Sequence, residues 1–209
     1  MILFGTDGIR GRYGDFPLDD STIKKIGCSI AKSFGNTVKK VIIGHDGRES
    51  CGAILDNLTD GINFINNYDI INLELFPTPS LPLILSKNDS EDAIGIEITA
   101  SHNPYLDNGI KIFNKNGYKI SSELERKIEE IVATQNDINK TSSTKFINSS
   151  PMKSVYIDFI SGLLSSIKEC PTNLNVAVDC ANGATSRVIN DITFPDNISL
   201  NIFNNSPNG

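Results

Sequence analysis

Short apolar runs alternate with helix-like patterns between residues 1 and 133, and this alternation restricts the possible folds more than any other feature of the chain. Such alternation is typical of α/β proteins, in which helices cover both faces of a sheet. We therefore predict an α/β unit with three α/β/α layers around a mixed, mostly parallel sheet. Asp20-Ser21 and the Ser122/Glu125 pair are the predicted caps of the first and last helices. The predicted strands are 1–4, 38–44, 69–75, 93–98 and 110–113, and the predicted helices are 20–35, 50–66, 81–85 and 122–133.

A polar segment separates this unit from a second one. Residues 134–150 are rich in Asn, Ser and Thr, which predicts a linker or mobile loop. Beyond it follow a helix, a strand over 175–180, a helix ending at Asp191 and a strand over 198–203. So few elements cannot cover both faces of a parallel sheet. We expect an α/β domain at 1–133, a linker at 134–150, and the start of a second, similar and incomplete α/β domain at 151–209.

Net charge, cysteine spacing and the lack of long apolar runs indicate which partners and which cell compartment to expect. The 19 Lys and Arg residues against 25 Asp and Glu give a net charge of −6, which argues against nucleic acid as the main partner. No C-x-x-C pair or metal-ligand spacing is present, so we expect free thiols in a reducing compartment. No leader-like or membrane-spanning run is present, which predicts a cytoplasmic protein with no membrane partner. The cysteines are Cys28, Cys51, Cys170 and Cys180.

The strand predicted at 93–98 delivers Ser101 to a loop just past its C-terminal end. In open α/β sheets, ligands bind outside the carboxyl ends of the strands. Asn103-Pro104 and Asn108-Gly109 are turn pairs, so we expect the loop to bend tightly. With His102 beside it and Lys111 nearby, Ser101 is a candidate reacting group.

The same loop sequence has two other interpretations. A surface turn whose Ser and Asn side chains bond to their own backbone would look the same in sequence. A serine hydrolase is disfavoured, because Ser101 and His102 are chain neighbours and no Gly-x-Ser-x-Gly elbow is present. His45, the other histidine, is interpreted as a loop side chain.

Two further glycine-containing segments carry charged side chains. In residues 5–14, glycines allow backbone amides to approach an anion, and Arg10 and Arg12 offer fork-shaped donors for phosphate. Thr6 is expected to help position the same segment. After the strand at 38–44, Asp46 and Arg48 are expected to tie the local loop together.

Residues 4–12 (FGTDGIRGR) and 99–104 (TASHNP), the latter followed by DNGIK at 107–111, resemble the α-D-phosphohexomutase family. The first motif resembles the bacterial branch that acts on glucosamine phosphate. The second resembles the phosphoserine loop, and GHDGR at 44–48 fits the family's Gly-x-Asp-x-Arg pattern. Two long motifs in the expected order make the match specific.

The resemblance implies a role for each candidate residue. Ser101 would be phosphorylated and act as the phosphoryl donor. Arg10 and Lys111 would neutralise its charge, with Lys111 assisting proton transfer, and His102 would steady the phosphoryl group. The residues implied to contact substrate are Thr6, Arg12 and Asn103.

The implied reaction converts glucosamine 6-phosphate to glucosamine 1-phosphate through a bisphosphate, for cell-wall UDP-N-acetylglucosamine synthesis. A hexosamine phosphate would be the small-molecule partner and a hexose bisphosphate the primer. Mg²⁺ is the expected cofactor, with phosphorylated Ser101 as one of its oxygen ligands.

The sequence also departs from the family. The Asp-Gly-Asp-x-Asp-Arg metal loop, the sugar-selecting loop and the C-terminal phosphate loop are absent from these residues, so this chain alone is expected to be inactive. DCANGA at 179–184 resembles the opening of the family's second domain and is interpreted as a structural turn. A phosphomannomutase or phosphoglucomutase, and a truncated remnant that binds a phosphosugar without turnover, stay open as alternatives.

Overall fold

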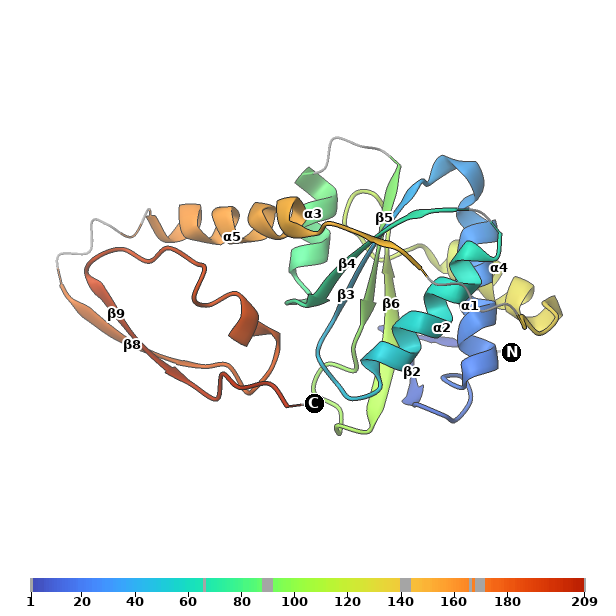
Figure 1. The fold of residues 1–209 in the computed structure, drawn as a ribbon, viewed down its shortest axis with the longest axis horizontal. Helices are drawn as coiled ribbons and strands as arrows, with labels where there is room; N and C mark the ends of the chain where they lie inside the picture. The colour runs from blue at the N-terminus through green and yellow to red at the C-terminus, as the bar shows by residue number, and fades with distance from the viewer. Residues whose placement is uncertain are drawn as a thin grey trace.

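A mixed seven-stranded sheet, in the order β1-β2-β6-β5-β3-β4-β7, lies at the centre of the computed structural model (Figure 1). The structure describes residues 2–65, 67–87, 92–139, 144–165, 167 and 172–208, and the strand count refers to these residues. The strands are β1 (Phe4–Gly5), β2 (Gly8–Arg12), β3 (Lys40–His45), β4 (Asp69–Leu75), β5 (Ala93–Ile98), β6 (Asp107–Phe113) and β7 (Phe146–Ile147).

The pairing directions confirm the predicted mixed, mostly parallel sheet. Strand β3 is parallel to β4 and β5, and β7 is parallel to β4. Strand β6 is antiparallel to both β5 and β2, and β1 forms an antiparallel hairpin with β2. Strands β2, β3, β4, β5 and β7 therefore share one direction, and β1 and β6 run the opposite way.

Helices cover both faces of this sheet, as the α/β/α prediction required. Helices α1 (Asp20–Phe34), α2 (Cys51–Asn63) and α4 (Ser122–Thr134) lie on one face, and α3 (Ser80–Lys87) on the other (Figure 1). Strand side chains alternate between the faces. In β3, Val41 and Ile43 pack toward the first set of helices and Ile42 toward α3.

Two glycines bring α1 and α2 into close contact. A Cβ atom on Gly27 would collide with the carbonyl oxygen of Leu58, and one on Gly61 with the carbonyl oxygen of Lys24. Each glycine therefore faces the backbone of the other helix. The periodicity of the apolar residues predicted both helices, but the close approach comes from these glycines.

The helix caps differ from the predictions by one residue. Asp19, rather than Asp20-Ser21, caps α1 by accepting from the amide of Thr22 at 3.0 Å. Ser121, rather than Ser122, caps α4 and accepts from the amide of Leu124 at 3.3 Å. The Ser122/Glu125 capping box is therefore wrong, because the chain is still extended at Ser121. Gly35 ends α1 with φ 56°, a value that suits glycine, and a short 3-10 turn, η1 (Gly35–Thr37), follows.

The segment predicted as a linker contributes to the first sheet. Within 134–150, Phe146 and Ile147 form β7, whose partners on β4 are Ile70 and Ile71. A further helix, α5 (Ser150–Ser165), begins directly after it. Both side chains of β7 are exposed, so main-chain hydrogen bonds rather than burial hold this edge strand in place.

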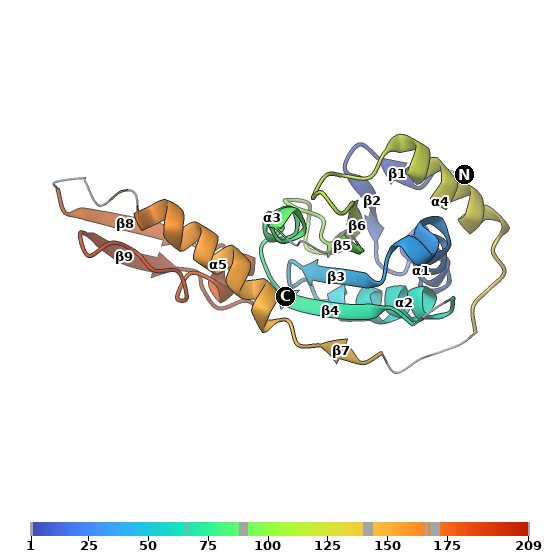
Figure 2. The same ribbon diagram turned by 90° about the horizontal axis from the view of Figure 1, so that it is seen from above.

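The C-terminal segment forms an arm beside the sheet (Figure 2). Strands β8 (Leu174–Asp179) and β9 (Ile198–Phe203) form a separate parallel pair. The helix predicted to end at Asp191 is wrong, since only the 3-10 turn η3 (Ala184–Arg187) forms there. Met152, Val155 and Tyr156 at the start of α5 pack beside the core on the α3 face.

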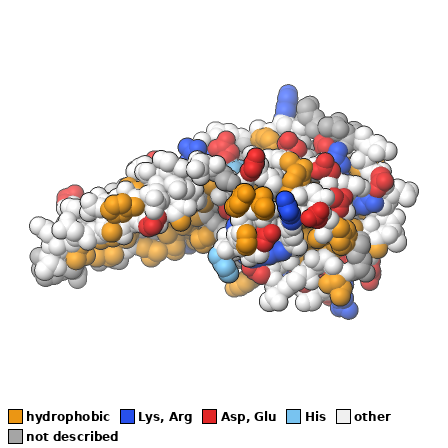
Figure 3. All heavy atoms as spheres, turned by 90° about the horizontal axis from the view of Figure 1, so that it is seen from below, with side chains coloured by type: hydrophobic (Ala, Val, Ile, Leu, Met, Phe, Trp, Pro, Cys, Tyr) orange, Lys and Arg blue, Asp and Glu red, His pale blue; other side chains and the backbone are white. Residues whose placement is uncertain are grey.

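Apolar side chains remain exposed along this arm (Figure 3). Helix α5 buries none of its side chains fully, and Phe159 and Leu163 are 40% and 53% exposed. The described residues leave this part of α5 uncovered. None of the helices described in the structure is both long and apolar enough to cross a membrane.

Candidate functional site

Ser101 lies in the loop that directly follows β5, with its side chain exposed. Its φ of 59° is in the left-handed region, which is uncommon for a residue other than glycine. Its amide donates to the hydroxyl of Thr99 at 2.9 Å, and its own hydroxyl lies 3.3 Å from Nδ1 of His102. The loop therefore presents the Ser101 hydroxyl to solvent at the carboxyl edge of the sheet.

Arg48 fixes the shape of this loop from the segment that follows β3. Its guanidinium donates to four backbone oxygens, at distances of 2.6 to 3.0 Å. Asp46 accepts from Arg48 Nε at 2.9 Å and from the hydroxyl of Thr99 at 2.7 Å. The Asp46–Arg48 pair confirms the prediction that these residues tie their local loop together, whereas the reach of Arg48 to the Ser101 loop was not predicted. The four carbonyl groups belong to Ser101, Asn103, Pro104 and Asp107.

Of the two predicted turn pairs, one forms a turn and the other does not. At Asn103-Pro104 the chain turns, with the amide of Asn103 donating to the carbonyl of Ala100 at 3.2 Å. Asn108-Gly109, by contrast, lies inside β6, so the turn predicted there is wrong. A Cβ on Gly109 would lie 2.5 Å from the carbonyl oxygen of Ile9, so this glycine permits close packing of β2.

Arg10 and Lys111 lie on neighbouring strands and share one carboxylate. The Arg10 guanidinium donates to the carbonyl of Ala100 at 2.7 Å and to Oδ1 of Asn103 at 3.1 Å, which holds it against the Ser101 loop. Arg10 Nη2 and Lys111 Nζ then contact the same oxygen of Asp7, at 2.7 and 2.8 Å. The hydrogen bond from Lys111, reinforced by Arg10, lowers the pKa of Asp7 from its usual 3.8.

The other two predicted substrate contacts lie apart from one another. Thr6 is in the turn between β1 and β2, beside Asp7, and its carbonyl accepts from Lys119 Nζ at 2.8 Å. Arg12 is exposed at the far end of β2 and lines a separate hollow with Tyr13 and Tyr105. The structure therefore brings together Arg10, Lys111, Asn103 and the Ser101 loop but leaves Arg12 outside this group.

Glu97 is a buried acid beneath this site that sequence reasoning missed. Glu97 lies on β5 and is only 1% exposed. Its Oε1 accepts a hydrogen bond from the Thr78 hydroxyl at 3.3 Å, and its Oε2 has no hydrogen-bond partner among the described residues. Burial raises its pKa well above 4.5, and the charge of Asp46 adds to the increase. Glu97 was overlooked because residues 93–98 were interpreted as an apolar strand. A single acid within such a strand was the sequence signal that could have identified it.

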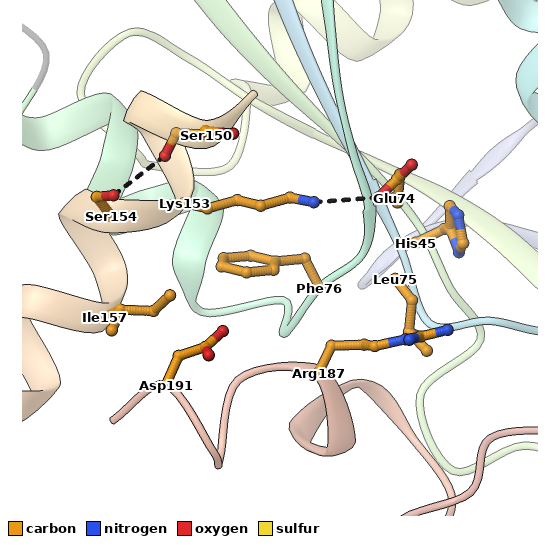
Figure 4. Close-up of a pocket in the computed structure, with 10 residues that line it drawn as sticks. All are labelled: His45, Glu74, Leu75, Phe76, Ser150, Lys153, Ser154, Ile157, Arg187 and Asp191. Carbon is orange, nitrogen blue, oxygen red and sulfur yellow. Dashed lines mark hydrogen bonds and ion pairs between the residues drawn. The ribbon is translucent and has the colours of Figure 1, made fainter. Parts of the chain in front are cut away.

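His45 is the last residue of β3 rather than part of a loop, and it lines a cavity of about 740 Å³ (Figure 4). Burial lowers the pKa of its imidazole. Lys153 reaches across from α5 to Glu74 at 3.1 Å, and Arg187 and Asp191 approach from the C-terminal segment. The described lining does not include Ser101, so His45 belongs to a different cavity.

The described residues do not by themselves form a magnesium site. No group of three or more His, Cys, Asp or Glu in this part of the chain could hold a metal ion. Two carboxylates of this region are already engaged by cations, Asp46 by Arg48 and Asp7 by Arg10 and Lys111. Mg²⁺ bound through phosphorylated Ser101 stays a prediction.

Three cysteines are free thiols, as predicted: Cys28, Cys51 and Cys180, all of them buried. Burial raises the pKa of Cys51 to about 11, which makes its thiol a poor nucleophile. The prediction for Cys170 lies outside the described residues.

Comparisons with known proteins agree with this architecture. The model of the phosphoglucomutase/phosphomannomutase α/β/α domain I matches residues 1–139. Phosphoglucosamine mutase of Aliarcobacter butzleri is 37% identical over 100% of this chain and 48% of its own length. The enzyme of Mesorhizobium japonicum is 33% identical over 99% of this chain and 46% of its own length. The chain thus spans about half the length of the curated relatives it matches.

Solved structures with low sequence identity share the fold. A phosphoglucomutase/phosphomannomutase family protein from Burkholderia thailandensis has a TM-score of 0.74 at 21% identity, covering 100% of this chain and 45% of that one. Parafusin, a phosphoglucomutase from Paramecium, has a TM-score of 0.67 at 18% identity, covering 98% and 43%.

Proposed function

Because the chain belongs to the phosphoglucomutase/phosphomannomutase family, we propose that Ser101 is the phosphoryl carrier of a phosphoglucosamine mutase. Such an enzyme interconverts glucosamine 6-phosphate and glucosamine 1-phosphate. The observation that supports this most strongly is the geometry around Ser101. Its exposed hydroxyl stands on a loop that Arg48 holds by four carbonyl groups, and Arg10 is bonded to the same loop.

The proposed reaction consists of two phosphoryl transfers. In the first, a hydroxyl oxygen of the sugar phosphate attacks the phosphorus of phosphorylated Ser101. The bond from phosphorus to Ser101 Oγ breaks, a bond to the sugar oxygen forms, and the hydroxyl proton passes overall to Ser101 Oγ. In the second, Ser101 Oγ attacks the phosphorus of the other phosphate of the resulting bisphosphate. The bond from that phosphorus to the sugar oxygen breaks, a bond to Ser101 Oγ forms, and the Ser101 hydroxyl proton passes overall to the sugar oxygen. The net change is the position of one phosphate.

Arg10 and Lys111 would supply the charge that this reaction requires. A phosphoserine carries a charge of about −1.5 to −2 near neutral pH. Phosphoryl transfer is accelerated mainly by positioning and by neutralising charge. Arg10 contacts the Ser101 loop directly, and Lys111 is linked to Arg10 through Asp7. His102, with Nδ1 3.3 Å from Ser101 Oγ, would steady the phosphoryl group or the attacking hydroxyl.

The choice of glucosamine among sugars rests on the sequence relatives. The two relatives described above, at 33% and 37% identity, are phosphoglucosamine mutases. A phosphomannomutase or phosphoglucomutase activity is the alternative within the family, since parafusin is a phosphoglucomutase. For the glucosamine reaction we propose a role in supplying glucosamine 1-phosphate for UDP-N-acetylglucosamine synthesis.

The test is turnover by the protein that carries this chain, primed with a hexose bisphosphate and Mg²⁺. Glucosamine, glucose and mannose 6-phosphates are offered separately, and the 1-phosphate products are measured. We expect the highest kcat/KM with the glucosamine substrate, loss of turnover in Ser101→Ala, and full turnover in Ser122→Ala, which alters an exposed serine on α4. Full activity in Ser101→Ala would refute the proposal, and a preference for mannose or glucose phosphate would move it to the alternative.

A further inference from the structure

A single carboxylate oxygen joins the two cations of the candidate site. Oδ2 of Asp7 lies 2.7 Å from Arg10 Nη2 and 2.8 Å from Lys111 Nζ. Asp7 is in the turn between β1 and β2, and Lys119 holds the carbonyl of the preceding Thr6 at 2.8 Å. The backbone of the turn is thus held separately from the Asp7 side chain.

Asp7 covers the two cations from the solvent side. Its side chain is 58% exposed, whereas those of Arg10 and Lys111 are 25% and 17% exposed. An exposed side chain changes rotamer rapidly, on the picosecond to nanosecond scale. Rotation about χ1 of Asp7 would therefore uncover both cations without moving the backbone.

We propose that Asp7 is a displaceable counter-ion, whose carboxylate takes the place between Arg10 and Lys111 that a phosphoryl oxygen occupies when phosphate is bound. The inference rests on the proposed function, because that function places a phosphoryl group beside these cations. Asp7 would then set how tightly the site holds phosphate at each stage of the reaction.

The charges explain why the carboxylate yields to phosphate. Asp7 offers one negative charge and contacts both cations through the same oxygen. A phosphoryl group brings a charge of about −1.5 to −2 and three acceptor oxygens, so each cation can have an oxygen of its own. The ion pairs keep the pKa of Asp7 below 3.8, so the carboxylate is charged, and competes, throughout the neutral range.

The experiment measures binding of inorganic phosphate by titration calorimetry to the protein that carries this chain. Asp7→Asn and Asp7→Ser both remove the charge with residues that suit a turn. We expect the Kd for phosphate to fall about tenfold in both variants, since two partly exposed ion pairs no longer compete. Asp15→Asn, which removes a charge from another exposed aspartate near the N-terminus, is expected to leave the Kd unchanged.

A double variant locates the bound phosphate. In Asp7→Asn combined with Lys111→Gln, the gain in affinity is expected to disappear, because one of the two released cations is gone. An unchanged or weaker affinity in both single Asp7 variants would overturn the inference and make Asp7 a residue that only orients Arg10 and Lys111. If phosphate binding tightens but Ser101 never carries phosphate, the displacement stands and the proposed function fails.

Discussion

Arg48 Nη2 donates a hydrogen bond of 3.0 Å to the carbonyl oxygen of Ser101, so a side chain from the segment after β3 holds the backbone of the candidate reacting residue. Three further carbonyl groups of the same loop accept from this guanidinium. The left-handed conformation of Ser101 is therefore maintained by a residue that lies far from it in sequence.

Replacing Arg48 with lysine should loosen the loop. A lysine ammonium lacks the planar fork of donors and cannot serve four carbonyl groups at once. We expect Arg48→Lys to lower the free energy of unfolding by about 1 kcal/mol, because four exposed or partly buried carbonyls lose charge-assisted hydrogen bonds. Denaturant titration measures this change, with Arg126→Lys on the exposed surface of α4 as the matched control. Equal stability of the two variants would contradict the role given to Arg48.

Glu97 should make stability depend on pH. Its pKa is raised in the folded protein, so the folded state holds a proton that the unfolded chain releases above pH 4.5. The stability contributed by the protonated acid is full below pH 4.5 and declines as the pH rises toward the folded-state pKa. The groups facing Glu97 are Thr78, Asp46 and Lys111, of which Asp46 raises and Lys111 lowers its pKa.

Glu97→Gln replaces the titratable acid with a neutral amide of nearly the same shape. We expect the variant to gain stability relative to the parent as the pH rises from 5 to 9. The gain is about 1 kcal/mol for each pH unit, up to the raised folded-state pKa of Glu97. Thermal unfolding midpoints across this range measure the difference. A constant difference between the two proteins would show that Glu97 is not protonated when folded.

Alanine substitution at two glycines of α2 should have opposite effects on stability, because Gly61 faces α1 and Gly52 does not. Gly61→Ala would place a methyl group against the carbonyl of Lys24, and we expect a loss of about 2 kcal/mol in unfolding free energy. Gly52→Ala has open space around its Cβ, and we expect a gain of about 0.5 kcal/mol from helix propensity. Denaturant titration of both variants tests the pair. Tolerance of alanine at Gly61 would mean that the helices can separate at little cost.

The first α/β unit was predictable because its elements have strong periodicity and clear ends. Helices α1 and α2 and strands β3, β4 and β5 appear within a few residues of their predicted positions. Strand β7 was missed because a pair of exposed residues, Phe146 and Ile147, has no pattern of its own and depends on an edge of β4. The pair Asn108-Gly109 was misassigned, since the usual turn signal here serves close packing instead.

The candidate site was only partly predictable. The motifs identified Ser101, Arg10 and Lys111, which the fold brings to one edge of the sheet. The shared contact of Arg10 and Lys111 with Asp7 could not be inferred, because it depends on the register of β2 against β6. Arg12 looked equivalent to Arg10 in sequence, but it lies at the far end of β2 in a separate hollow.

The central claim, that Ser101 carries the phosphoryl group, is tested most directly by locating transferred phosphate. The protein that carries this chain is incubated with a hexose bisphosphate labelled on both phosphates, digested and mapped by mass spectrometry. We predict the label on Ser101 in the parent protein and no label in Ser101→Ala. Phosphate on another residue, or on none in the parent protein while the bisphosphate stays intact, would contradict the account.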